Sequence, residues 1–175
     1  MKNFSLFIFS ITLFSMAQAG DYNWNHMDIG YNDDGEGSGP TLTISSDIND
    51  DWFARANILR IDYDDVDVES RLAFLTVGYQ MSSLYMEAGL ARVDVCQYVC
   101  GDDSGAVFMV GTTTGNEKLN AKIGIGVMEI IDETWTIFEL DASYAISDNL
   151  GIYIGLMGLD DLGDNTTKLG VRYSW

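Results

Sequence analysis

The feature that most constrains this chain is a two-residue periodicity that runs from Gly20 to the last residue. It is clearest at the end of the chain, where Leu169, Val171, Tyr173 and Trp175 alternate with Lys168, Gly170, Arg172 and Ser174. Side chains alternate between two faces in this way on β-strands, whereas an amphipathic helix repeats every 3.6 residues. The periodicity therefore predicts an all-β fold.

Two kinds of polar segment divide the alternating pattern, and they take turns along the chain. Short polar turns at 49–51, 82–83, 115–117 and 147–149 alternate with acidic segments at 32–40, 62–69, 96–105, 131–134 and 160–166. The intervals predict strands at 22–31, 41–48, 52–61, 70–80, 84–95, 106–114, 118–130, 135–146, 150–159 and 167–175. Five membrane hairpins of about 30 residues each would take up about the length of residues 20–175, since a spanning strand needs ~10 residues. Eight strands is the alternative, in which two weaker segments are loops.

The first nineteen residues differ from the rest and predict export. Lys2 precedes an apolar run from Phe4 to Phe14, and Ala17-Gln18-Ala19 forms a small-x-small cleavage signature. We expect residues 1–19 to be a signal peptide and residues 20–175 to be the folded domain. A single membrane anchor is the alternative, although the run is shorter than the ~20 residues that a spanning helix needs. No later stretch could span as a helix, so insertion into a membrane requires a closed barrel.

The less apolar face of the strands has a composition suited to a narrow lumen. It combines small residues with seven isolated charges, namely Asp28, Arg55, Glu87, Lys122, Glu139, Asp141 and Arg172. Opposite charges inside a barrel are expected to pair, because an unpaired buried charge is costly. Aromatic residues near strand ends are typical of interfacial girdles, here Tyr31, Trp52, Tyr79, Trp135, Tyr144, Tyr173 and Trp175. These features favour a transmembrane antiparallel up-and-down β-barrel over a soluble lipocalin-like barrel, whose apolar face points inward.

The last eight residues resemble the C-terminal signal of bacterial outer-membrane β-barrels. The defined positions of that signal are a polar residue, a glycine and two aromatics, matched here by Lys168, Gly170, Tyr173 and Trp175. The resemblance implies recognition by the barrel-assembly machinery through the last strand, and residence in the outer membrane among its lipids and lipopolysaccharide. Within that class, the size, glycine content and acidic segments are similar to the YfaZ-type outer-membrane proteins. We expect a monomer with both termini in the periplasm.

The charge of the chain excludes one class of partner and suggests a weak metal site. Its formal net charge is -18, with 27 acidic and 9 basic residues, which disfavours nucleic acid as a partner because phosphate binding needs clustered cations. The densest acidic cluster is Asp62, Asp64, Asp65, Asp67 and Glu69, whose oxygens are possible calcium ligands. No acidic run matches a twelve-residue calcium loop, so a solvated, repulsive surface is the favoured reading. Divalent ions shared loosely with lipopolysaccharide phosphates are a third reading. We expect no cofactor.

Cysteine and histidine offer few candidates for chemistry. In an exported chain, Cys96 and Cys100 are predicted to form a disulfide, with free thiols as the alternative. His26 is the single histidine, and no nucleophile or carboxylate stands at a spacing that would mark a catalytic site around it. We therefore expect no enzyme activity.

The predicted function is an integral outer-membrane barrel with a structural or interaction role in the envelope and acidic surface loops. Barrels of about eight strands are filled by their own side chains, and wide aqueous channels need about sixteen strands. A narrow channel for ions or small solutes is therefore the alternative. A lipid- or peptide-modifying barrel enzyme is a third candidate.

The C-terminal signal generates a testable prediction. Replacing Trp175 by Glu should abolish most of the folded protein in membrane fractions, because the terminal aromatic residue of the signal is lost. The measurement is the amount of heat-modifiable protein on gels of the membrane fraction. Ser83→Glu, which adds the same charge in a predicted turn, should leave that amount unchanged. Normal levels of the Trp175→Glu variant would contradict this reading of the chain end.

Overall fold

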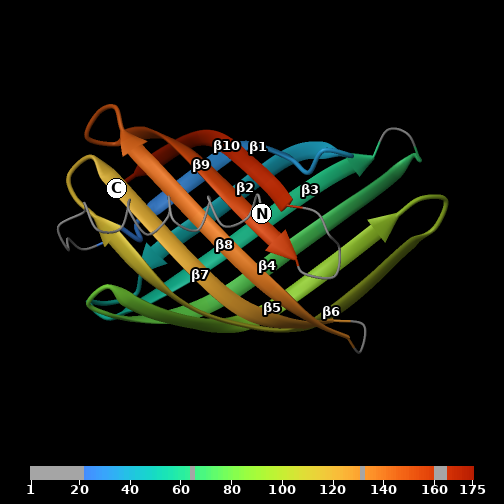
Figure 1. The fold of residues 1–175 in the computed structure, drawn as a ribbon, viewed down its shortest axis with the longest axis horizontal. Coiled ribbons are helices and arrows are strands. Elements are labelled where there is room, and N and C mark those ends of the chain that lie inside the picture. The colour runs from blue at the N-terminus through green and yellow to red at the C-terminus, as the bar shows by residue number, and fades with distance from the viewer. Residues whose placement is uncertain (1–21, 64–65, 131–132, 160–164) are drawn as a thin grey trace, which may run out of the picture.

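Ten strands form one closed, all-antiparallel barrel in the computed structural model, which describes residues 22–63, 66–130, 133–159 and 165–175 (Figure 1). Each strand pairs with its neighbours along the chain, and β10 closes the barrel against β1. The predicted fold class is confirmed, with ten strands and not eight. The predicted signal peptide, residues 1–19, lies outside the described residues.

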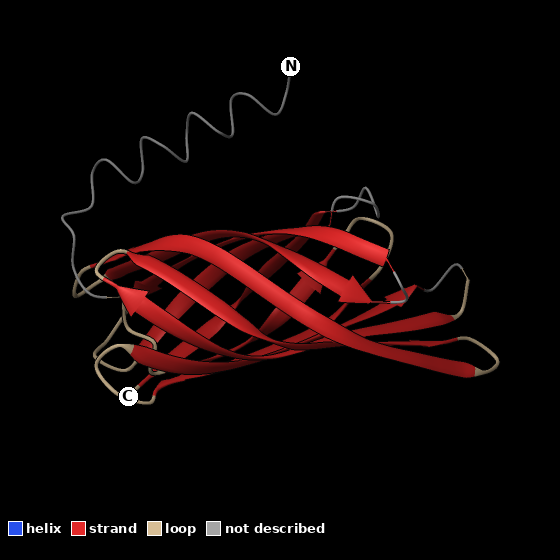
Figure 2. Ribbon diagram, turned by 90° about the horizontal axis from the view of Figure 1, so that it is seen from below, coloured by secondary structure: helices blue, strands red, loops and turns tan. Residues whose placement is uncertain are grey.

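The strands differ in length around the barrel. Their bounds are β1 (His26–Asp33), β2 (Ser38–Asp47), β3 (Trp52–Tyr63), β4 (Val68–Met81), β5 (Leu84–Cys96), β6 (Cys100–Gly115), β7 (Leu119–Ile130), β8 (Glu133–Ala145), β9 (Leu150–Leu159) and β10 (Asn165–Ser174). We call the end that holds the C-terminus and the four short turns the terminal end, and the opposite end the hairpin end. Strands β4, β5 and β6 have 14, 13 and 16 residues, against 8 for β1. Long hairpins consequently project from one side of the hairpin end (Figure 2).

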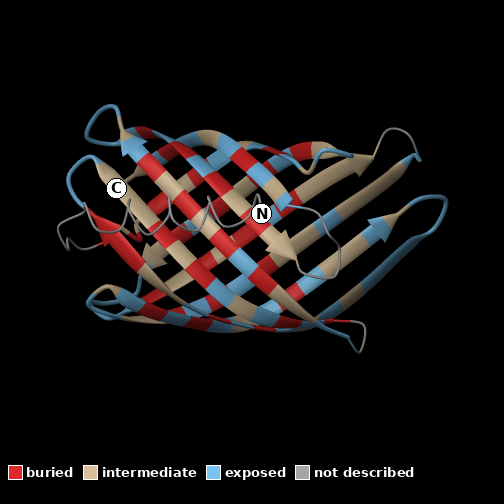
Figure 3. Cartoon of the chain, viewed as in Figure 1, coloured by how far each residue is buried: buried red, intermediate tan, exposed pale blue. Residues whose placement is uncertain are grey.

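The apolar face of the strands points outward. Leu75, Leu90 and Leu169 are 61%, 65% and 62% exposed on the outer wall, while charged residues such as Glu87 and Lys122 are buried inside. Buried and exposed residues alternate along the strands (Figure 3). The soluble, lipocalin-like alternative is therefore wrong, because such a barrel has its apolar face inside. Among the described residues, no helix is long and apolar enough to cross a bilayer.

Two predictions of local structure at aromatic residues are wrong. The first strand begins at His26, and Tyr22 and Trp24, predicted to lie in that strand, are buried at the mouth of the barrel instead. Their rings pack with Phe53 and Tyr85 in this mouth. Trp135, predicted for the outer girdle, packs against a cluster inside the lumen. Trp135 lies an even number of residues from the inward residues Ile137 and Glu139, which we call the same parity. Residues of the same parity on a strand share a face, so the Trp135 side chain points inward.

The strands extend further than predicted at the hairpin end. The predicted acidic segment 96–105 belongs largely to the β5–β6 hairpin, in which Cys96 lies opposite Cys100. The predicted segment 32–40 shrinks to a turn at 34–37. A backbone ladder does not need an apolar face, so strands continue through polar residues once both faces are in water. Apolar alternation marks the lipid-facing part of each strand and not its hydrogen-bonded length.

The turn at 34–37 is held by a carboxylate. Asp34 accepts hydrogen bonds from the backbone N–H of Gly37 at 2.7 Å, from that of Glu36 at 3.0 Å and from the Tyr63 hydroxyl at 2.8 Å. Partial burial would raise the pKa of this carboxyl, but these three hydrogen bonds outweigh it, so the pKa lies below its ordinary value. The negative charge at this turn is thus retained at neutral pH.

Gly78 makes room for the ring that fills the terminal end of the lumen. A Cβ at this position would lie 2.1 Å from Cζ of Phe53. Phe53 cannot readily move away, because its ring stacks on Trp24 with centroids 3.6 Å apart and planes 7° apart. The glycine therefore serves close packing against a large side chain.

This packing predicts that Gly78→Ala destabilises the barrel by about 1–3 kcal/mol, the usual cost of an overpacked core. The measurement is the free energy of unfolding of the refolded barrel in urea. Gly101→Ala is the matched control, since a Cβ there would meet nothing within 4 Å. Equal stability of the two variants would contradict the proposed role of Gly78.

Candidate functional site

The lumen is filled in three layers, and the first is aromatic. At the terminal end, Tyr22, Trp24, Phe53 and Tyr85 form a buried cluster. The Trp24 indole N–H donates to the Gln80 side-chain oxygen on β4, and its ring meets Tyr85 edge-on at a centroid distance of 5.6 Å. The segment before β1 is thus anchored inside the mouth of the barrel.

The second layer is a network of ion pairs centred on Glu139. Arg55 on β3 donates from Nη1 to both Glu139 oxygens, at 3.0 and 2.8 Å, and from Nη2 to Glu87 at 2.6 Å. In a ten-strand ring, β3 and β8 lie on opposite sides, so this pair crosses the lumen. Glu87 also accepts the Thr76 hydroxyl at 2.8 Å. The guanidinium therefore ties three strands together across the barrel.

Two lysines complete the network. Lys122 Nζ lies 2.9 Å from Glu139 and 3.3 Å from Asp141. Lys168 Nζ lies 3.4 Å from Glu139 and 3.7 Å from Asp141. Lys122 also stands 5.9 Å from the ring centroid of Trp24, within the range of a cation–π contact. The network is thereby joined to the aromatic layer.

A separate pair stands beside the network. Arg172 grips Asp28 with two parallel contacts of 2.7 Å, the geometry of a bidentate pair. Its Nη1 donates to the Ser143 hydroxyl at 2.9 Å and to the Tyr22 hydroxyl at 3.3 Å. This arginine secures the N-terminal segment to β1 and β8.

The buried charges balance among the described residues. Besides His26, the cations are Arg55, Lys122, Lys168 and Arg172, and the anions are Asp28, Glu87, Glu139 and Asp141. The structure buries all seven residues predicted as lumen charges. Lys168 is the eighth, which sequence reasoning assigned only to the assembly signal although it shares the parity of Arg172. Since the lumen charges cancel, the excess negative charge of the chain lies elsewhere.

The third layer is apolar and was not predicted. Towards the hairpin end the lumen is filled by Leu59, Phe74, Ala91, Val107, Met109, Met128, Ile130, Ile137 and Met157. Alternation alone does not reveal such a layer, because segments such as 107–114 are apolar at both parities. Between this layer and Arg55 lies a cavity of about 10 Å³, about enough for one water molecule. The described side chains of the three layers thus occupy most of the lumen.

His26 is buried at the start of β1. It is 2% exposed, and its Nδ1 lies 3.0 Å from the Asn23 carbonyl oxygen, while Nε2 lies 3.7 Å from Asp28. Ser45 is its partner across the β1–β2 ladder. Within the described part of the chain, however, the Ser45 hydroxyl has no hydrogen-bond partner. His26 and Ser45 therefore do not form the hydrogen-bonded pair of a base and a nucleophile.

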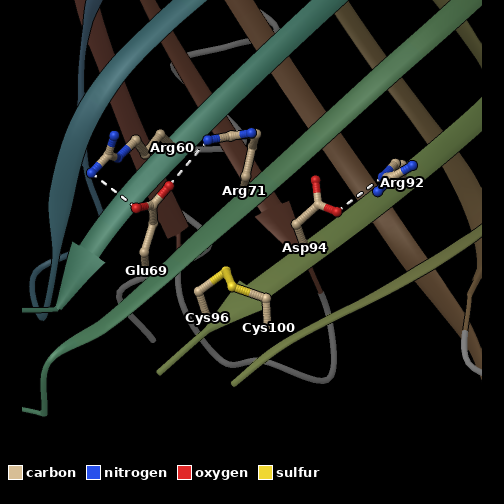
Figure 4. Close-up of a disulfide and its surroundings, with 7 residues drawn as sticks. All are labelled: Arg60, Glu69, Arg71, Arg92, Asp94, Cys96 and Cys100. Carbon is tan, nitrogen blue, oxygen red and sulfur yellow. Dashed lines mark hydrogen bonds and ion pairs between the residues drawn. A yellow bond between two sulfur atoms is a disulfide. The ribbon is translucent and has the colours of Figure 1, made fainter. Parts of the chain in front are cut away.

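The predicted disulfide and calcium-ligand residues lie near the hairpin end. The Cys96 and Cys100 sulfurs are joined in a disulfide, close to the ion pairs of Arg60 with Glu69 and of Arg92 with Asp94 (Figure 4). Of the calcium candidates, Asp62 and Glu69 pair with Arg60, Asp67 has a positive φ of 50°, and Asp64 and Asp65 lie outside the described residues. No group of three potential metal ligands occurs in the described ranges.

Gly170, Tyr173 and Trp175 of the predicted assembly signal lie on or just beyond β10. Tyr173 and Trp175 face outward at the terminal end, with ring centroids 6.3 Å apart. In the closed barrel β10 pairs with both β9 and β1, so its edge would be open only before closure.

Comparison with known proteins identifies the fold and not a family. No protein family and no curated protein matches the sequence, so the resemblance to YfaZ-type proteins is not confirmed. The structure is similar to the KdgM porin, with a TM-score of 0.52 and 11% identity over 86% of this chain and 99% of that one. It is similar to the NanC porin with a TM-score of 0.50 and 14% identity, covering 86% and 100%.

A de novo designed transmembrane β-barrel also matches, with a TM-score of 0.44 and 10% identity over 91% of this chain and all of the other. The two porins are the matches that support the fold. The chain therefore has the fold of bacterial outer-membrane β-barrels, as its sequence predicted.

The Glu139 network generates a prediction. Glu139→Gln should destabilise the barrel by about 3 kcal/mol or more, because it leaves Arg55, Lys122 and Lys168 buried with one partner fewer. The measurement is again the free energy of unfolding in urea. Asp102→Asn, which breaks an exposed ion pair with Arg92, should cost at most about 1 kcal/mol. A Glu139→Gln variant as stable as Asp102→Asn would contradict the central role of Glu139.

Proposed function

We propose that this protein is an integral outer-membrane barrel with a closed lumen, whose structural or interaction role in the envelope is carried by its outer surface. The observation that supports this most directly is the filled lumen. Balanced ion pairs bridge its centre, an aromatic cluster caps one end, and an apolar layer fills the other. Solute passage would require these layers to separate.

The proposed orientation puts the terminal end in the periplasm and the hairpin end outside the cell. Outer-membrane barrels have short periplasmic turns and longer outer segments, and the projecting β4–β6 strands agree with that rule. The outer wall would contact membrane lipid, including lipopolysaccharide, and Tyr173 and Trp175 would lie at the inner interface. We propose a monomer that the barrel-assembly machinery inserts through its last strand.

A narrow channel is the second candidate, and one specific observation favours it. Tyr22 and Trp24 close the periplasmic mouth although they belong to no strand. Beside them lies a surface hollow of about 520 Å³. A non-strand segment can leave a mouth more easily than a strand can leave a barrel, because it breaks no backbone ladder. The segment 22–25 would then be a plug. The KdgM and NanC porins share this fold.

An enzyme is the third candidate, and no observation favours it over the other two. The described lumen holds His26 without a paired nucleophile, and a cavity too small for a lipid or peptide. That the protein is not an enzyme stays a prediction.

Single-channel recording tests the proposed function. The chain refolded from Gly20 and inserted in planar bilayers should give no discrete current steps, because three layers of side chains fill the lumen. A porin refolded in the same way is the positive control. Discrete steps from the parent chain would overturn the closed-lumen proposal.

The plug is tested in the same assay with Trp24→Ala. Steps from this variant alone would favour a gated channel. Silence from both proteins, together with heat-modifiable mobility that shows the barrels to be folded, would support the closed scaffold.

A further inference from the structure

The two most exposed large apolar side chains of the described structure are neighbours at the tip of the β5–β6 hairpin. Tyr98 is 90% exposed and Val99 is 83% exposed, and the next highest value is 69%, for Ile146. The outward charges of Asp94 and Asp102 separate this tip from the apolar wall below it. In the proposed orientation, Tyr98 and Val99 therefore stand in the water outside the cell and not against lipid.

Covalent and hydrogen bonds hold this tip in one conformation. The Cys96–Cys100 disulfide joins the ends of β5 and β6 (Figure 4) and leaves only residues 97–99 between them. The Gln97 side-chain amide donates to the Val66 carbonyl oxygen at 3.1 Å, which ties the tip to the turn between β3 and β4. A loop that is already fixed loses little conformational entropy when it binds a partner.

Three exposed apolar residues meet in this place. Val66, at the turn that Gln97 contacts, is 55% exposed, and we call Val66, Tyr98 and Val99 the tip patch. Isolated exposed apolar residues are ordinary on protein surfaces, but these three are held together at the end of a projecting hairpin. Burying apolar surface is favourable, and tyrosine is among the residues that contribute most to protein interfaces. The tip patch is thus suited to docking.

Carboxylates outnumber cations around the tip patch. The described carboxylates on these hairpins are Asp62, Asp67, Glu69, Asp94, Asp102 and Asp103, and the cations are Arg60, Arg71 and Arg92. Each of these arginines already contacts a carboxylate at 2.9 to 3.2 Å. Within the described ranges, Asp67 and Asp103 have no cationic partner at such distances. The surroundings of the tip patch are therefore net negative.

This charge selects among the possible occupants of the tip patch. A phosphorylated headgroup brings further negative charge, and a second copy of this chain brings a second acidic tip, so both would be repelled. A basic peptide segment has the opposite charge, and its apolar side chains can cover the tip patch. Complementary charges of this kind also speed the encounter and fix the orientation of the partner.

We propose that the tip patch is a docking site for a basic, amphipathic peptide segment of another protein. The apolar side chains of that segment cover Tyr98 and Val99, and its lysine or arginine side chains pair with Asp67 and Asp103. This proposal deepens the interaction role given under the proposed function and rests on the orientation stated there.

The apolar half of the site is tested by titrating the folded barrel, in nanodiscs of zwitterionic lipid, with a fluorescent helical peptide of leucine and lysine. The Tyr98→Ser, Val99→Ser double variant should bind about tenfold more weakly than the parent, because the apolar surface that the peptide covers is lost. Ile146→Ser is the matched control, since it removes an exposed apolar side chain at the terminal end. It should bind like the parent, and binding to empty nanodiscs is subtracted.

The charged half is tested with the Asp67→Asn, Asp103→Asn double variant. It should bind about threefold more weakly, and its affinity should fall less steeply with salt concentration than that of the parent, because two attracting charges are gone. Asparagine tolerates the positive φ of Asp67, so the turn is preserved. Asp50→Asn, Asp51→Asn, which neutralises two exposed carboxylates at the terminal end, should keep the parental affinity and salt dependence.

Four outcomes would overturn the site. They are absence of peptide binding by the parent, parental affinity in the Tyr98→Ser, Val99→Ser variant, an equal loss in Ile146→Ser, and equal binding of a peptide with glutamate in place of lysine. Heat-modifiable mobility verifies that each variant is folded before titration. Failure here leaves the closed-lumen proposal untouched, because that proposal is judged by current alone.

Discussion

The ion pair between Arg55 and Glu139 is the interaction on which the interior depends. It joins strands on opposite sides of the ring, and Glu139 is at the same time the shared partner of Lys122 and Lys168. In a low-dielectric interior, charges are tolerated only when each is paired and hydrogen-bonded. The equal number of buried cations and anions satisfies that condition. The same cross-links that make the charges tolerable also obstruct the lumen.

The neutral interior explains how a strongly acidic chain can form a narrow barrel. Inward carboxylates are matched one for one by cations, so the excess of acid falls on turns, hairpins and rims where water screens it. Both ends of the lumen are then filled by side chains that carry no formal charge, aromatic at one end and mostly aliphatic with methionine at the other. Methionine suits such a layer because its flexible side chain fills irregular gaps.

Much of this architecture could be predicted from the sequence, because a two-residue period has only two faces to assign. The strand number, the direction of the apolar face and the seven inward charges followed from parity and from turn spacing. The wrong predictions concern features that the alternation of side chains does not determine. Trp135 was placed by its nearness to a strand end and not by its parity. The predicted strand at 22–31 includes Tyr22 and Trp24, because an alternating pattern does not distinguish a strand from a segment that folds into the mouth of the barrel.

The apolar inner layer and the outer arginines were missed for a related reason. Met109, Met128 and Met157 stand at inward positions. An interpretation that assigns apolar residues to the lipid-facing wall does not predict that they fill the lumen. Arg60, Arg71 and Arg92 are separated by many residues in the sequence and share no motif. They meet only because hairpin pairing sets the register of β3, β4 and β5. Proximity created by register is visible in a structure alone.

The uneven height of the barrel connects these observations to function. The long strands β4, β5 and β6 carry Arg71, Arg92, the disulfide and the acidic residues Asp94, Asp102 and Asp103. A strand that continues beyond the lipid costs little when its backbone remains paired, and it lifts side chains away from the membrane on a rigid support. Paired and packed side chains occupy the interior. The side chains that remain accessible to a partner lie on the outer wall and on the projecting ends of β4, β5 and β6. This distribution supports the proposal that the outside of the barrel carries its role in the envelope, while the inside holds the barrel together.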